Sequence, residues 1–320
     1  MLAVRIENGS VKVIEVPKPR RKKGWALVRL RCAGICNTDV ELLRGYYGFA
    51  GIAGHEFVGE VVEADQKRLV GKRVVGEINI ACGKCGWCAS GMKRHCSRRS
   101  VLGIVAHPGA FREIIDLPEE NLHVVPDNVP DEHAVFTEPV AAAGEILDQV
   151  RIPTGDTVAV LGDGKLGLLI AQVMAVCGLK VEHFGRHPQK LRISKKAGVR
   201  TRVAGGRMPR AAYQIVVEAT GSPSGLKQAI EMVEPRGVVV MKSTVHGDVP
   251  VDTAPVVVNE ITLLGSRCGR FEPAIRVIES GKLRLDEMIS ARYPISEAPA
   301  AFQKAVEPGV IKVLLTASGR

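Results

Sequence analysis

The chain has 320 residues, a length at which one hydrophobic core usually gives way to two domains. Hydrophobic residues make up 46% of it and glycine is abundant, which argues against intrinsic disorder and suits an α/β protein with many tight turns. Much of the formal net charge of +10 lies in two runs, 18–23 and 93–99, which predict solvated basic surfaces. Aromatic residues do not interleave with these runs, so we expect no nucleic-acid partner.

The amino-terminal segment lacks the apolar core of a signal peptide. Residues 1–16 alternate apolar with polar side chains, and no apolar run approaches the ~18 residues needed to cross a bilayer. We therefore expect a cytoplasmic protein without a membrane partner. In a reducing compartment its eight cysteines are expected to be thiols or metal ligands instead of disulfides.

The first part of the chain, up to about residue 135, is predicted to be rich in β-strands. Its runs of β-forming residues are separated by Gly, Pro and Asn. The strand candidates are residues 4–16, 24–34, 56–64, 72–80 and 111–118.

A cysteine-rich loop interrupts this region at residues 82–96. Three of its cysteines have CxxCxxC spacing and a fourth follows, which gives enough thiolates to close a tetrahedral zinc shell. A closed shell leaves no position for water or substrate, so we predict a structural zinc site, with an iron–sulfur cluster as the alternative. The ligands would be Cys82, Cys85, Cys88 and Cys96.

A second candidate metal site is spread along the chain. Cys36, His55, Glu56 and Glu138 could each have an ordinary structural role, as a buried thiol, a hydrogen-bonded core histidine or an acidic residue at a helix start. Together they offer the mixed sulfur, nitrogen and oxygen ligands of catalytic zinc sites, in which one position is kept for water or substrate.

From residue 138 the pattern changes to alternating helices and apolar strands. A helix is predicted at 138–150, and the spacing that follows indicates βαβ units and a doubly wound parallel sheet. The segment 204–212 is too short and broken for a full crossover helix. Another helix is expected at 272–283 and a last strand at 311–317. The six strand candidates of the sheet are 157–162, 179–185, 199–204, 214–221, 237–243 and 261–266.

Gly162, Gly164 and Gly167 have GxGxxG spacing directly after a strand and at the start of a helix. The first glycine permits a tight turn, the second lets backbone amides approach a pyrophosphate, and the third allows close packing of helix on strand. We therefore predict a dinucleotide site.

The end of the next strand bears on which dinucleotide binds. NAD sites usually carry an Asp or Glu there for the ribose hydroxyls, but this strand ends in Gly185, Arg186 and His187. A guanidinium without a neighbouring carboxylate suits a 2′-phosphate, so NADP(H) is favoured over NAD(H). The alternative is that Arg186 is a solvent-exposed loop residue and Glu182 binds the ribose.

Taken together, these residues resemble the zinc-dependent medium-chain alcohol and polyol dehydrogenases. The segments 34–45 and 54–61, the cysteine loop, 137–139, the glycine loop and 216–221 follow the family order along essentially the whole chain. Glu138, where simple alcohol dehydrogenases carry Cys, resembles the sorbitol, threonine and glucose dehydrogenase branches.

The resemblance implies an α/β fold of two domains with the active site in the cleft. A GroES-like, β-rich catalytic domain would comprise 1–139 and 269–320, with the structural zinc loop at 82–96. A doubly wound, parallel-sheet Rossmann domain would comprise 140–268. Relatives are dimers or tetramers, so a homodimer or homotetramer is expected.

The resemblance also implies roles for single residues. Cys36, His55 and Glu138 would bind the catalytic zinc, and Glu56 would join them or exchange with water. Thr38 would take the proton of the alcohol, and Asp39 would hydrogen-bond His55 and fix its tautomer. Many relatives carry His at the position of Glu41, so the proton would leave through this carboxylate or through water alone.

The motif and the resemblance together give the expected contacts of the dinucleotide. Residues 216–221 would run beneath the nicotinamide, and the loop after the next strand would line its other side. The expected cofactor-binding residues are Gly162, Gly164, Lys165, Leu166, Gly167, Gly185, Arg186, His187, Lys190, Ala219, Thr220, Ser243 and Thr244.

The predicted protein is a zinc-dependent oxidoreductase with two zinc ions per chain. It would transfer hydride between NADP(H) and a secondary alcohol, polyol or sugar and the matching carbonyl compound. One alternative is an NAD-dependent dehydrogenase of the threonine or sorbitol type. Another, of a different class, is a non-catalytic regulatory protein that binds zinc and nucleotide.

Overall fold

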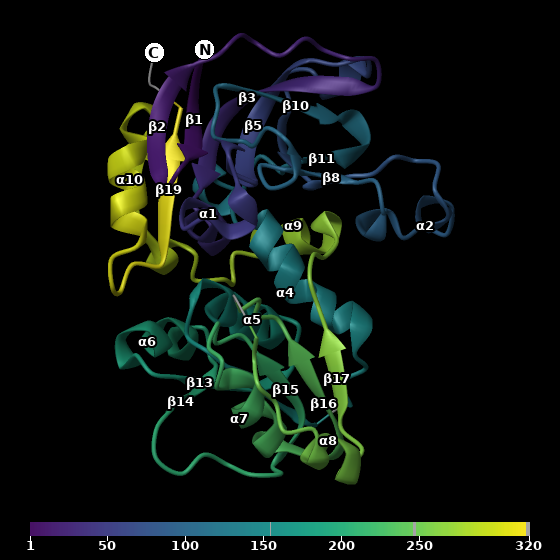
Figure 1. Cartoon of the computed structure of the whole chain (residues 1–320), viewed down its shortest axis with the longest axis vertical. Coiled ribbons are helices and arrows are strands. Elements are labelled where there is room, and N and C mark those ends of the chain that lie inside the picture. Colours follow the sequence, from purple (N-terminus) through teal and green to yellow (C-terminus); the bar gives the residue numbers. More distant parts are fainter. Residues whose placement is uncertain (154, 246–247, 318–320) are drawn as a thin grey trace. The chain divides into compact units, whose positions relative to one another are not determined.

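The computed structural model describes residues 1–153, 155–245 and 248–317 (Figure 1). The chain divides into two compact units, one of Met1–Glu138 with Ile289–Arg320 and one of Pro139–Met288. The first unit therefore joins the two ends of the chain, and the second is continuous. In the described ranges, no helix combines the length and the apolar character that a membrane span requires.

The first unit is built on a seven-stranded sheet with the order β11-β6-β5-β3-β19-β18, in which β10 also pairs with β3. β19 pairs antiparallel with β3, so the carboxyl-terminal segment completes a sheet that begins near the amino terminus. In Figure 1 β19, in yellow, lies among the purple and blue strands. The strands are β3 (Trp25–Gly34), β5 (Glu56–Glu63), β6 (Arg73–Gly76), β10 (Ile114–Pro118), β11 (Leu122–Val124), β18 (Ile289–Pro294) and β19 (Lys312–Thr316).

Among the described residues of this unit, two smaller sheets and four α-helices accompany the main sheet. One sheet holds β1 (Leu2–Glu7), β2 (Ser10–Glu15) and β4 (Gly51–Ile52), and the other holds β7 (Asn79–Ile80), β8 (Ser100–Leu102) and β9 (Ala106–His107). The helices are α1 (Asn37–Leu43), α2 (Gly86–Ala89), α3 (Asp131–Ala134) and α10 (Ala298–Ala305). The β-rich region expected from the sequence is confirmed, whereas α10 and β18 were not predicted.

The second unit contains one six-stranded, fully parallel sheet with the order β14-β13-β12-β15-β16-β17. Counted along the chain this is 3-2-1-4-5-6, the strand order of the Rossmann fold. The predicted doubly wound sheet is thereby confirmed. The strands are β12 (Thr157–Leu161), β13 (Lys180–Gly185), β14 (Arg200–Val203), β15 (Tyr213–Glu218), β16 (Val233–Met241) and β17 (Thr262–Gly265).

Six α-helices accompany this sheet in the described part of the unit, and no helix forms within the described segment 204–212, as its shortness predicted. Buried apolar side chains such as Leu161, Phe184 and Val216 form the core around the sheet. The helices are α4 (Thr137–Gln149), α5 (Lys165–Val176), α6 (Pro188–Lys196), α7 (Gly225–Met232), α8 (Ala254–Val258) and α9 (Phe271–Glu279).

The two compact units differ from the predicted domains at the second boundary. Residues 269–288 were expected in the catalytic domain but group with the parallel-sheet unit. Arg270 forms an ion pair with Asp148 of α4 at 2.7 Å, and the backbone N–H of Arg284 donates to Gln172 of α5 at 2.7 Å. These contacts tie the segment to the helices of the second unit.

Candidate active site and metal centres

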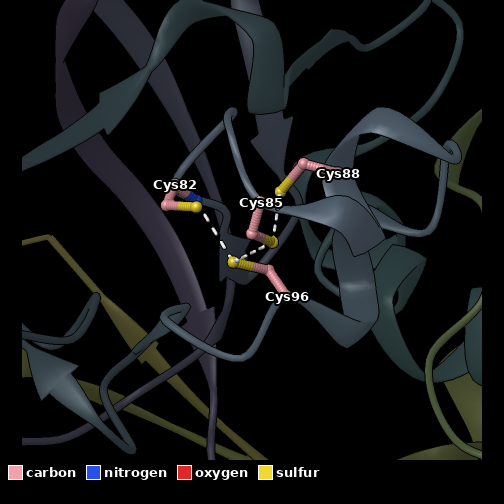
Figure 2. Close-up of side chains that lie close together, drawn as sticks. All are labelled: Cys82, Cys85, Cys88 and Cys96. Atoms are coloured by element: carbon pink, nitrogen blue, oxygen red, sulfur yellow. Dashed lines mark hydrogen bonds between the residues drawn. The ribbon is translucent and has the colours of Figure 1, made fainter.

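The four cysteines of the loop 82–96 converge on one point (Figure 2). Their sulfur atoms all lie within 4.8 Å of one another, and Cys85 Sγ is 3.4 Å from Cys88 Sγ and 3.7 Å from Cys96 Sγ. These separations are far longer than the ~2.05 Å of a disulfide. They approach the ~3.8 Å between sulfurs expected for a tetrahedral ion with Zn–S bonds of ~2.3 Å.

The electrostatics of this cluster also fit a cation. Backbone N–H groups, that of Lys84 above all, lower the pKa of Cys82 to about 6, and an Arg98 nitrogen lies 3.5 Å from its sulfur. Burial and the neighbouring thiols raise the pKa of Cys88 to about 11. A cation bound between the sulfurs would favour the ionised form of Cys88, and four cysteine sulfurs are a donor set that suits zinc.

The predicted ligands Cys36, His55 and Glu56 form a second cluster, with one ligand atom of each within 4.8 Å of the others. Cys36 immediately precedes α1, His55 immediately precedes β5, and Glu56 is the first residue of β5. β5 pairs with β3 so that Glu56 lies opposite Gly34, two residues before Cys36 in the chain. The sheet register therefore brings together segments that are about twenty residues apart.

Asp39 connects the two segments that carry Cys36 and His55. Its fully buried carboxylate accepts hydrogen bonds from the backbone N–H groups of Cys36 at 2.8 Å and Gly54 at 3.1 Å. Asp39 Oδ1 is 3.4 Å from His55 Nδ1, although this nitrogen makes no hydrogen bond within the described residues. A carboxylate on this side leaves the opposite ring nitrogen of His55 for a ligand.

The charge around His55 makes the cluster attractive to a cation. Burial alone would lower the pKa of His55, but the charges of Asp39 and Cys36 raise it well above its usual value. The same negative charges would stabilise a metal ion, and sulfur, nitrogen and oxygen donors are the mixed set that zinc accepts. The residues present therefore fit a zinc ion.

Lys312, a residue that sequence reasoning missed, is part of this cluster. It is 1% exposed, its ammonium donates to the Glu56 carboxylate, and it lies 5.5 Å from the centre of the Phe136 ring. Glu56 is also 1% exposed, so the pair is a buried ion pair. The one available signal was a single lysine within the apolar strand 311–317, because a lysine is rarely buried unless it is paired.

The remaining predicted residues of this site lie less centrally. Glu138 is half-buried in the first turn of α4 and, within the part of the chain that the structure describes, is not one of the mutually close ligand atoms. Thr38 is half-buried, with its hydroxyl 3.8 Å from Cys36 Sγ. Glu41, at the position expected for a proton exit, is ion-paired with Arg44 at 2.8 Å.

The glycine loop after β12 has the form expected of a dinucleotide cradle. Gly162 has φ of +111°, and a Cβ there would lie 2.3 Å from the Ala219 carbonyl oxygen. A Cβ on Gly167 would lie 1.9 Å from the Gly162 carbonyl oxygen. A Cβ on Gly164 would meet nothing within 4 Å, so the backbone there is open to a phosphate at the amino end of α5, where Lys165 and Leu166 begin the helix.

His183 contacts the first turn of this loop through a hydrogen bond to its backbone. It is fully buried in β13, with Nε2 2.8 Å from the Gly162 carbonyl oxygen and Nδ1 2.8 Å from the Ser194 hydroxyl of α6. Burial lowers its pKa, so the neutral ring donates from Nε2 to Gly162 and accepts at Nδ1 from Ser194. Sequence reasoning missed this positioning role.

The residues predicted for the nicotinamide end lie after β15 and β16. The backbone N–H and hydroxyl of Thr220 donate to Glu218 Oε1 at 2.8 and 2.6 Å. The Gly221 N–H donates to Ser243 Oγ at 2.8 Å, and Thr244 is exposed beside it. Ala219 lies against Gly162, so these segments meet at the carboxyl ends of the strands, where doubly wound sheets bind ligands.

Gly185, Arg186, His187 and Lys190 lie where β13 ends and α6 begins. Glu182, the alternative ribose ligand, is engaged elsewhere. It accepts a hydrogen bond from the Tyr213 hydroxyl at 2.7 Å and pairs with Arg202.

Comparisons with known proteins agree with this geometry. The family model for the alcohol dehydrogenase GroES-like domain matches residues 22–127, and that for zinc-binding dehydrogenase matches residues 166–280. An erythritol/L-threitol dehydrogenase of Mycolicibacterium smegmatis is 31% identical over 96% of this chain and 91% of that protein.

Two solved structures are similar along nearly the whole length. The alcohol dehydrogenase RspB of Escherichia coli CFT073, complexed with NADH, is 25% identical with a TM-score of 0.91 and covers 99% of both chains. A zinc-binding dehydrogenase of Sinorhizobium meliloti bound to NADP is 29% identical with a TM-score of 0.90 and covers 98% of both. The chain belongs to the zinc-type medium-chain alcohol and polyol dehydrogenases, with a GroES-like and a Rossmann-type domain.

Proposed function

We propose that this protein is a zinc-dependent oxidoreductase that transfers hydride between a nicotinamide dinucleotide and a secondary alcohol, polyol or sugar and the matching carbonyl compound. The observation that carries the proposal is the cluster of Cys36 with the buried His55 and Glu56, supported by Asp39 and Lys312. The relative named an erythritol/L-threitol dehydrogenase supports a polyhydroxylated substrate.

Two zinc ions are proposed, one for each cluster. Cys82, Cys85, Cys88 and Cys96 would hold a structural ion in a closed shell. Cys36 and His55 would hold the second ion, together with a carboxylate from Glu56 or Glu138. When bound, the catalytic zinc supplies Lewis acidity to the substrate oxygen and the nicotinamide supplies or accepts the hydride.

The chain's own residues orient the reaction and move the proton. Asp39 fixes the positions of Cys36 and the segment before His55 through its two backbone hydrogen bonds. The hydroxyl of Thr38, beside Cys36 Sγ, would accept the alcohol proton while it passes its own hydroxyl proton on toward solvent. Because the Glu41 carboxylate is ion-paired with Arg44, water is the better candidate for the exit of that proton.

The choice of dinucleotide depends on the surroundings of Gly185. The sequence predicts NADP(H), because the end of β13 carries Arg186 and no carboxylate of its own, and no observation so far tests this prediction. RspB and the Sinorhizobium protein, which bind NADH and NADP respectively, show that both cofactors occur among similar folds. The assembly into a homodimer or homotetramer also stays a prediction.

A substrate screen tests the proposal directly. Purified protein would be offered NAD and NADP with a panel of secondary alcohols, polyols and aldoses, and the formation of reduced nicotinamide would be followed by absorbance. We expect turnover with at least one member and none in the Cys36→Ala variant. A protein that binds dinucleotide but turns over nothing in the panel would instead favour the non-catalytic regulatory alternative.

A further inference from the structure

The space beside Gly185, at the end of β13, is filled by a carboxylate from a different loop. A Cβ on Gly185 would lie 2.4 Å from the Cβ of Asp163 and 2.6 Å from its Oδ2. Asp163 stands between the first two glycines of the turn after β12. Gly185 is therefore required by Asp163, because any side chain at position 185 would displace this carboxylate.

Asp163 is held in this place by the start of α6. Its carboxylate accepts the backbone N–H of His187 at 2.5 Å, and both of its oxygens lie 3.1 Å from His187 Nδ1. The residue is 8% exposed. Burial alone would raise the pKa of Asp163, but the hydrogen bonds from His187, with the charges of His187 and Lys190, hold it below its usual value. Asp163 is therefore a fixed anion at neutral pH.

The position of this anion corresponds to a known function of the fold. In dinucleotide sites an acidic residue at the end of the second strand binds the ribose hydroxyls. β13 is that second strand, and its own last residue is a glycine. We propose that Asp163 replaces the missing strand-end carboxylate, accepts the 2′-hydroxyl of the adenosine ribose and disfavours a 2′-phosphate, so that the site prefers NAD(H).

This inference rests on the proposed function, because it concerns the same dinucleotide site, and it reverses the preference expected from the sequence. The opposing feature is Arg186, which is exposed and makes no hydrogen bond or ion pair in the described ranges of the chain. Arg186 could attract a 2′-phosphate, but that phosphate would have to lie beside a buried carboxylate that stays ionised. Two negative charges at short range repel each other, so we expect Asp163, and not Arg186, to determine which dinucleotide binds more tightly.

Equilibrium binding separates the two outcomes without relying on turnover. The dissociation constants of NADH and NADPH would be measured from cofactor fluorescence for the zinc-loaded protein, with ADP-ribose and its 2′-phosphate as competitors. We expect NADH to bind at least about tenfold more tightly than NADPH, the amount that one charge-assisted hydrogen bond supplies. A preference of the unaltered protein for NADPH would overturn the inference.

The decisive variant is Asp163→Asn, which keeps an oxygen to accept the His187 N–H but removes the charge. The ratio of NADPH to NADH dissociation constants should fall at least about tenfold. Glu231→Gln is the matched control: it removes a carboxylate from α7 that is 40% exposed and paired with Arg210, and should leave the ratio unchanged. Melting curves would show that both variants are folded.

The outcomes also distinguish this inference from the function on which it rests. If both dinucleotides bind and Asp163→Asn leaves their ratio unchanged, only the role of Asp163 is wrong. If the unaltered protein prefers NADPH and Arg186→Ala weakens the binding of NADPH but not of NADH, then Arg186 determines the cofactor specificity. If neither dinucleotide binds to the folded protein, the proposed function itself is wrong, and the inference with it.

Discussion

The two cysteine-containing clusters of the first unit differ in how they are built. The loop 82–96 contributes four identical ligands from one short segment, and two of them, Cys82 and Cys85, are partly exposed. The Cys36–His55–Glu56 cluster takes three different ligands from two segments that the β3–β5 register joins, and its His and Glu are almost fully buried. The first cluster contains its own ligand set, whereas the second depends on the sheet.

This difference indicates a structural role for the first cluster and a catalytic role for the second. Four thiolates satisfy a zinc ion completely, so the loop can gain stability but offers no position for a reactant. The second cluster provides three ligand atoms and keeps Asp39, Thr38 and Lys312 around them. A buried site that orients its ligands through neighbouring polar groups is the arrangement expected for catalysis.

Removal of Cys36 should give the largest effect on activity. Cys36→Ala takes away the sulfur ligand of the proposed catalytic ion, and the loss of several kcal/mol of Lewis-acid stabilisation corresponds to about a 10⁴-fold lower kcat/KM. Cys32→Ala is the matched control, because Cys32 is a buried thiol of strand β3 that belongs to neither cluster. Equal activity of the Cys36→Ala variant and the unaltered protein in a steady-state assay would refute this assignment.

Removal of one loop cysteine should act on stability instead. Cys82→Ser opens the four-thiolate shell, and because structural zinc contributes to folding, the Tm should fall by about 10 °C. Turnover per folded molecule should change little. Calorimetry with and without a chelator would measure this, and an unchanged Tm would show that the loop does not depend on a metal.

Substitution of Lys312 tests whether the buried ion pair between Lys312 and Glu56 stabilises the protein. Lys312→Met leaves the Glu56 carboxylate buried without its counter-ion, which should cost about 3–5 kcal/mol of unfolding free energy in denaturant titrations. Adding Glu56→Gln should restore most of that stability. Lys304→Met, which breaks an exposed pair with Glu307, should leave the unfolding free energy nearly unchanged. Similar losses for the two lysines would contradict the buried pair.

Of the four substitutions, that of Asp39 should have the smallest effect. It should change only how tightly the second cluster retains its metal. Asp39→Asn removes the charge that orients the Cys36 and His55 segments, so the affinity of the second cluster for zinc should fall about 10- to 100-fold. Titration with a chelator should then release one ion earlier and leave the release of the other unchanged. If both ions were released as before, Asp39 would be only a structural residue.

Local patterns in the sequence were enough to predict much of this molecule. The glycine loop, the apolar strands of the parallel sheet and the cysteine loop each lie within a few consecutive residues, and the structure contains all three. The absence of a helix in the described segment 204–212 could also be predicted locally, because the segment is too short for a crossover helix. The resemblance to the family supplied the link between the distant segments of Cys36 and His55.

What the sequence could not reveal depends on contacts between distant segments. Lys312 meets Glu56 only because β19 pairs with β3, and the two residues are separated by most of the chain. Asp163 reaches Gly185 only because β12 and β13 lie side by side. The glycine at the end of β13 looked like a missing carboxylate, although the carboxylate comes from the neighbouring loop.

The division of roles between the two clusters is tested most directly by counting zinc. Metal analysis would be carried out on the unaltered protein, on Cys36→Ala and on Cys82→Ser, with turnover measured on the same samples. We predict two ions per chain in the unaltered protein, and one ion with no turnover in folded Cys36→Ala. A Cys36→Ala protein that keeps two ions and full turnover would contradict the account.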